Sequence, residues 1–324
     1  MKSLWQTWVD FWSETESGYS VAMVRISIGF TLLYTCCSPY LNGVWTAIWV
    51  DESYGGIRHY KKVPWLLEML GGATPSAVET MLWMGIAASI GLILGMAGRL
   101  SALVGMVVMN TISWHNPLAT GGHDDLIANA LWLLIFVQND CTHSVSCKIR
   151  TGLWRSNTPV YSIVRRLLLT QLIIMYASTG FQKVSAHWIP FGELDALWYI
   201  LQQPTWSWRN HQFLAPWFWV TQLGTLGTWL FEVFAPMMWI WMLWESRSDS
   251  PWYAPQWGQR LVRKWKPRVI FAGIGIPMHV GILITMDVGP FSYAALSYYW
   301  TLYRPIKTME SAENKSDQTA LVSL

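Results

Sequence analysis

The sequence has few charged residues. Of its 324 residues only 13% are Asp, Glu, Lys or Arg, about half the usual share in globular chains. The net charge is only +3, and no basic run is interleaved with aromatic residues on a soluble segment, so we expect no nucleic-acid partner. Together with a positive mean hydropathy of +0.26, the shortage of charge indicates an integral membrane protein.

Cysteine is also scarce, and its spacing excludes two common uses. The four cysteines form no CxxC pair, so we predict neither a zinc knuckle nor a redox motif. Residues 1–19 lack a basic region followed by an apolar core and a small-residue cleavage site, so they do not resemble a removable signal peptide. They are acidic and Trp-rich, and we expect an amphipathic helix that lies on the membrane.

Long apolar runs and tryptophan are abundant instead. The chain is 52% hydrophobic and contains 24 Trp, a residue that favours membrane–water boundaries. A spanning helix needs roughly 20 mostly apolar residues. The candidate spans are residues 21–50 (broken near Pro39), 77–98, 101–114, 125–137, 164–182, 216–244, 269–286 and 291–303.

These runs predict an all-α, polytopic membrane bundle of about eight spans, with seven to nine as the range. Short amphipathic helices at the interface complete it, including one within "ELDALWYILQQPTWSW". The transmembrane domain is expected over residues 20–305, followed by a disordered polar tail over 306–324. Most Lys and Arg fall on one side if both termini are cytoplasmic, which is the orientation that the positive-inside rule favours. The cluster at residues 58–62 is the exception.

Ionisable residues within the apolar runs are candidate functional groups, because charge is costly inside a bilayer. Arg25 either extends to the cytoplasmic headgroups or pairs with Glu232 inside the bundle. Glu232 is expected in mid-span, buried and paired, with Arg25 as the first candidate partner and His279 as the second. Pro236 follows it by one turn and should loosen the local backbone. His279 could equally be a neutral histidine that donates to a helix carbonyl.

Two histidines and two aspartates lie close together in "WHNPLATGGHDDL". Because His115 and His123 lie eight positions apart with Pro and two Gly between them, they are not a helical ligand pair, and we expect no metal there. Lys183 ends an apolar run within "ASTGFQKVSAHW". It is either a lysine that extends to water or a partly desolvated amine that acts as a base.

The segment that contains Lys183 resembles a signature of the vitamin K-dependent γ-glutamyl carboxylases and their bacterial relatives, the horizontally transferred transmembrane (HTTM) family. The matching positions are Gln171, Tyr176, Gly180, Lys183, Trp188 and Gly192, within "QLIIMYASTGFQKVSAHWIPFG". Further matches in the same order are "VRISIGFTLLY" with Arg25, "GGHDDLIANALWLLIF" with His123 and Asp125, "LFEVFAP" with Glu232, and "HVGILITMDVGPFS" with His279.

The resemblance implies a chemistry. In the carboxylases a lysine deprotonates a reduced quinone, which then reacts with O₂ to give a strong base. That base removes a γ-proton from a peptide glutamate, and CO₂ adds to the carbanion. On this reading Lys183 is the initiating base and His123 assists, both facing one cavity on the outer side, while Arg25, Glu232, His279, Tyr176 and Asp125 support them. The implied setting is a bacterial inner (plasma) membrane.

Two other readings stay open. One is a membrane component that matures or exports a secreted peptide toxin with a small partner protein, as a related bacterial protein does. The other is a non-catalytic bundle that binds lipid or quinone. The carboxylase-like chemistry requires a reduced quinone with O₂ and CO₂. We expect no metal in this chemistry or in the two alternatives.

Overall fold

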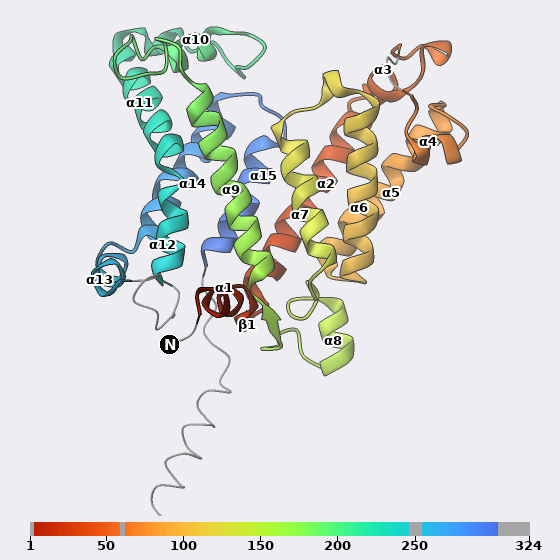
Figure 1. Cartoon of the computed structure of the whole chain (residues 1–324). Coiled ribbons are helices and arrows are strands. Elements are labelled where there is room, and N and C mark those ends of the chain that lie inside the picture. The colour runs from red at the N-terminus through yellow and green to blue at the C-terminus, as the bar shows by residue number, and fades with distance from the viewer. Residues whose placement is uncertain (1–2, 59–61, 246–254, 304–324) are drawn as a thin grey trace, which may run out of the picture. The chain divides into compact units, whose positions relative to one another are not determined.

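The computed structural model describes residues 3–58, 62–245 and 255–303. These residues are almost entirely helical (Figure 1). The predicted tail over 306–324 lies outside them, as does part of the basic cluster at 58–62. By contacts the chain divides into an amino-terminal unit, Ser13–Arg166 with Tyr303–Leu324, and a carboxyl-terminal unit, Met1–Trp12 with Leu167–Leu302. The residues expected to form one transmembrane domain therefore contribute to two compact units.

Four long helices make up the core of the amino-terminal unit: α2 (Tyr19–Leu41), α5 (Pro75–Leu94), α6 (Gly98–His115) and α7 (Gly122–Ile135). Each packs on the next, and α7 packs back on α2, so the four form a closed bundle (Figure 1). The short elements of this unit are α3 (Trp45–Trp49), η1 (Glu52–Tyr54), α4 (Trp65–Met69), η2 (Pro117–Ala119), α8 (Val145–Thr151), β1 (Thr15–Ser17) and β2 (Pro159–Tyr161).

The strands β1 and β2 pair antiparallel, with Glu16 opposite Val160. Two ion pairs connect this pair of strands further. Glu14, just before β1, and Glu16, within β1, each pair with an arginine that follows β2. Arg165 binds Glu16 through two hydrogen bonds of 2.6 and 2.8 Å, and Arg166 pairs with Glu14. Buried arginines that meet carboxylates in this way fix both segments, since each charge offsets the desolvation of the other.

The carboxyl-terminal unit is built from α9 (Ile163–Gln182), which begins at the unit boundary, and from α11 (Phe218–Phe234), α12 (Met237–Glu245), α14 (Pro267–Thr285) and α15 (Phe291–Tyr298). Helix α11 packs on α14, α14 on α15, and α12 on α14. The shorter elements are α1 (Leu4–Ser13), α10 (Ala196–Gln202), η3 (Gln212–Trp217), α13 (Gln256–Trp265) and η4 (Tyr299–Leu302). The helix predicted within "ELDALWYILQQPTWSW" is therefore present as α10.

The chain bends sharply between α11 and α12. The segment Gln212–Phe234 and the segment Met237–Trp244 meet at 50° across a short break, and Pro236 lies in that break. A proline cannot donate the hydrogen bond that would continue the helix. The expected loosening of the backbone at Pro236 is confirmed.

Among the described residues, three helices are long and apolar enough to cross a membrane: Tyr19–Leu41, Pro75–Leu94 and Pro267–Thr285. A fourth crossing results if the bent pair α11–α12 counts as one span. Large apolar side chains are exposed along α14: Val269, Ile270, Ile274, Ile276, Val280 and Ile284. A helix with such a surface is unfavourable in water and suited to lipid.

Candidate functional site

Lys183 lies directly after the last residue of α9 and pairs with a carboxylate in helix α11. Its ammonium forms an ion pair with Glu232, whose side chain is 8% exposed, while that of Lys183 is 20% exposed. The ammonium also lies 4.5 Å from the ring centroid of Trp188, within the range of a cation–π contact. Lys183 is therefore enclosed by a charge and an aromatic face, and a fifth of it meets solvent.

A glycine lets α9 and α11 approach closely enough for this pair to form. A Cβ at Gly180 would lie 2.8 Å from Cβ of Glu232 and 2.8 Å from the backbone nitrogen of Val233. Real Cβ atoms do not approach other atoms so closely, so any larger residue would push the helices apart. Gly180 precedes Lys183 by three residues, and the backbone nitrogen of Lys183 donates to the carbonyl oxygen of Gly180 at 3.3 Å.

The burial and pairing expected of Glu232 are confirmed, but its partner differs from the two that were expected. Neither Arg25 nor His279 is the partner: the structure pairs Glu232 with Lys183. Both charges are isolated in apolar sequence, and their opposite signs were the only signal of this pairing. Which of several buried cations meets a carboxylate depends on helix packing, which sequence spacing does not reveal.

Arg25 has a different role within the amino-terminal unit. Its side chain is completely buried. The guanidinium donates to the carbonyl oxygen of Leu92, in the last turn of α5, and to that of His143 at 2.7 Å. Carbonyl groups at a helix C-terminus have no partner within the helix, and a cation satisfies them well. Arg25 therefore joins the end of α5 to the segment around His143.

A second polar group involves Tyr176, one turn before Gly180 in α9. The hydroxyl of Tyr176 lies 2.6 Å from Nε2 of His279 in α14 and 2.8 Å from the hydroxyl of Tyr299 in η4. All three residues are buried. Tyr176 and Gly180 are four residues apart and lie on one face of α9, and Lys183 follows directly after the helix.

The ring of Tyr176 packs against other aromatic rings. Tyr176 contacts Phe231 with centroids 5.0 Å apart and Phe271 with centroids 5.9 Å apart. A Cβ at Gly275 would lie 1.6 Å from the hydroxyl of Tyr299, so a glycine is needed there to admit that side chain. Phe231 directly precedes Glu232 in α11, and the aromatic group is therefore continuous along the chain with the ion pair.

One atom of this group is buried without a partner. Nδ1 of His279 has no hydrogen-bond partner among the described residues, and the residue is 1% exposed. A buried polar atom that stays unsatisfied costs about 1–3 kcal/mol. Such an atom is accordingly a candidate contact for a bound polar molecule.

His123 belongs to the amino-terminal unit, at the start of α7. Its Nε2 lies 3.5 Å from Oδ1 of Asp124, while the other carboxylate oxygen of Asp124 accepts from the backbone nitrogen of Gly121 at 2.8 Å. Burial lowers the pKa of His123 and raises the pKa of Asp124. Asp125 is exposed. The predicted common cavity of His123 and Lys183 stays a prediction, since the two residues belong to separate units.

No known protein family matches the chain, and no curated protein or solved structure matches it either. The resemblance to the HTTM family therefore stays a prediction that depends on the sequence motifs.

Proposed function

We propose that this chain is a multi-pass membrane enzyme that deprotonates a quinol at the outer membrane face, with Lys183 as the base. The observation that carries the proposal is the buried ion pair of Lys183 with Glu232, next to the aromatic group of Tyr176. A structural ion pair needs no solvent access. This lysine keeps a fifth of its side chain exposed, so a ligand can reach it.

The pair can form a neutral amine without releasing a proton to water. If the proton of the ammonium moves to the carboxylate of Glu232, both groups become neutral, which a low-dielectric environment favours. Lys183 then accepts a proton from a ligand hydroxyl and is an ammonium again, while Glu232 holds the first proton. Glu232 is thus the proton acceptor that makes Lys183 a base.

The residues present are compatible with a quinone. Nδ1 of His279 offers an unsatisfied polar atom, and the packed rings of Tyr176, Phe231 and Phe271 give the site an apolar, aromatic environment. A reduced quinone bound there would supply an acidic hydroxyl and two electrons for O₂. His279 would orient the ring, and Trp188 would limit the access of water to Lys183. CO₂ and a peptide or small-molecule acceptor are proposed from the sequence resemblance alone.

We also propose that the chain crosses a bacterial inner membrane about eight times, with both termini in the cytoplasm. Each of the eight predicted spans overlaps one helix of the structure or two successive helices, which supports this topology. Four of the helices are short or polar: α6, α7, α9 and α15. In a membrane, neighbouring helices would have to shield the polar groups of these four from lipid.

The experiment is quinol-dependent O₂ consumption by the purified full-length protein. Lys183→Ala should abolish the activity and leave insertion and folding intact, and an added small primary amine should restore part of it by entering the vacated space. Asn210→Ala, at an exposed position of a neighbouring loop, is the control and should retain activity. Activity in Lys183→Ala without amine would contradict the proposal.

A further inference from the structure

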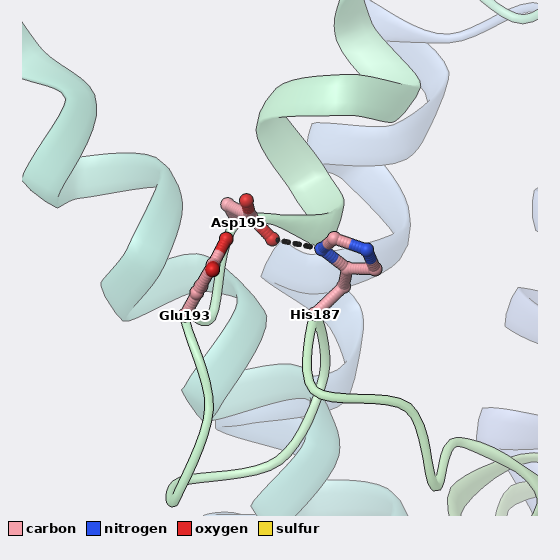
Figure 2. A group of neighbouring side chains, drawn as sticks. All are labelled: His187, Glu193 and Asp195. Carbon is pink, nitrogen blue, oxygen red and sulfur yellow. Dashed lines mark hydrogen bonds and ion pairs between the residues drawn. The ribbon is translucent and has the colours of Figure 1, made fainter.

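Three metal-ligating side chains converge in the loop between α9 and α10. His187, Glu193 and Asp195 each offer one ligand atom, and these atoms lie within 4.8 Å of one another. Figure 2 shows the imidazole and both carboxylates directed toward one another from a single loop. We propose that these three residues bind a divalent transition-metal ion, a site that the sequence did not predict.

The backbone that carries the ligands is closed by its own hydrogen bonds. The nitrogen of Glu193 donates to the carbonyl oxygen of Ala186 at 2.9 Å, and that of Ala196 to the carbonyl oxygen of His187 at 3.1 Å. The side chain of Gln222 in α11 donates to the carbonyl oxygen of Glu193 at 2.9 Å. The three ligands are therefore held near one another before any ion binds, which lowers the entropic cost of binding.

A close approach at Gly192 fixes the same loop. A Cβ at this position would lie 2.0 Å from the carbonyl oxygen of Ala186, so only glycine permits the turn that brings Glu193 back toward His187. Gly192 is also one of the positions that carried the sequence resemblance. Its packing role here is local: it brings two ligands six residues apart to one point.

The electrostatics of the group favour a cation. Nδ1 of His187 lies 2.6 Å from Oδ1 of Asp195, and the side chain of Asp195 is only 6% exposed. The carboxylate of Glu193 faces the same point, so two negative charges lie side by side (Figure 2). A divalent ion bound between the three groups offsets both charges.

The ligand set selects the kind of ion. Mg²⁺ and Ca²⁺ prefer oxygen ligands throughout, whereas one imidazole nitrogen with two carboxylate oxygens suits Zn²⁺ and its first-row neighbours. Three protein ligands leave one position of a tetrahedron for water. The half-exposed imidazole of His187, at 52%, leaves a route from solvent to that position.

Zn²⁺ titration by calorimetry of the full-length protein tests the proposal, after treatment with a chelator and with a purification tag that lacks histidine. The wild type should bind one equivalent with micromolar or tighter affinity. Glu193→Gln and Asp195→Asn should each weaken binding about tenfold or more. Asp287→Asn, which removes an exposed carboxylate elsewhere in the same unit, should bind as the wild type does.

Glu193 is exposed, so Glu193→Gln should fold normally, and its elution profile and thermal transition without metal check this. Zn²⁺ should raise the Tm of the wild type and leave that of Glu193→Gln unchanged. The absence of saturable binding in the wild type would overturn the proposal, as would equal affinity in Glu193→Gln and the wild type. Neither readout depends on quinol oxidation, so the metal site and the proposed function can fail separately.

Discussion

At the scale of single residues, Lys183 and Glu232 each interrupt an apolar segment, and each removes the cost of burying the other. Removing one partner leaves a charge that must be protonated, deprotonated or hydrated. In a double-mutant cycle of Lys183→Met and Glu232→Gln, we expect a coupling energy of about 1–3 kcal/mol, with the double variant more stable than additivity predicts. Unfolding in mixed micelles measures the four free energies. Additive effects of the two substitutions would show that the groups do not stabilise each other.

His123 gives a pH dependence whose sign follows from its burial. Burial lowers its pKa from the ordinary value of 6.5. As the pH falls, His123 is therefore protonated in the unfolded chain before it is protonated in the folded chain. The folded state therefore loses stability below about pH 6.5, until the folded His123 also titrates. Burial raises the pKa of Asp124 from 3.8. As the pH rises above about 3.8, the carboxyl group therefore loses its proton in the unfolded chain before it does so in the folded chain. Asp124 accordingly lowers the stability of the folded state as the pH rises from there.

Between pH 7.5 and 5.5 the fall in Tm should accordingly be smaller for His123→Gln than for the wild type. Thermal unfolding in detergent at the two pH values measures the difference between the two proteins, which cancels the contribution of other histidines. The expectation is wrong if the two proteins lose the same number of degrees.

The residues of the candidate site could be named from the sequence more easily than their contacts. Lys183, Glu232 and His279 were identifiable because ionisable groups are rare in apolar runs. The contact of His279 with Tyr176 was not, since it joins residues 103 positions apart. The group at His187 was missed because its ligands are spaced by six and two residues in a loop, and no helical or strand period brings such positions together.

At the scale of elements, the approach of α9 to α11 depends on one small residue. Gly180→Ala should lower stability by about 1–3 kcal/mol, because the added methyl group meets Cβ of Glu232 and the backbone at 2.8 Å. Gly273→Ala is the matched control: its Cβ would meet no described atom within 4 Å, and it should stabilise α14 slightly. Unfolding of both variants in mixed micelles measures this. If Gly180→Ala proves as stable as Gly273→Ala, the close packing of α9 on α11 is wrong.

The elements themselves were largely predictable. The apolar runs fall on helices because a continuous run of 15 to 20 such residues can satisfy its backbone only within a helix when water is excluded. Their ends were less predictable. The first run was expected to continue to residue 50 with a break near Pro39, but α2 continues through Pro39 to Leu41, and a separate helix α3 begins at Trp45.

At the scale of the whole molecule, a bundle of eight spans and a bundle of three or four spans differ in which loops lie on each side of the membrane. Eight spans place Asn210 outside and Asn157 in the cytoplasm. Single-cysteine variants at these exposed positions, in a background without the four natural cysteines, should react differently with an impermeant maleimide. Asn210→Cys should be labelled in intact cells, and Asn157→Cys only after permeabilisation. Labelling of both, of neither, or of Asn157→Cys alone in intact cells would contradict the topology, and three or four spans predict that neither is labelled.

Quinol-dependent O₂ consumption by Lys183→Arg distinguishes a lysine that acts as a base from one that only supplies a positive charge. Arginine keeps the positive charge and can reach Glu232, but it stays protonated at accessible pH and cannot accept a proton. We expect a folded, membrane-inserted Lys183→Arg protein with no quinol oxidation above background. Wild-type activity in that protein would show that Lys183 only anchors the end of α9 to Glu232, and would contradict the account.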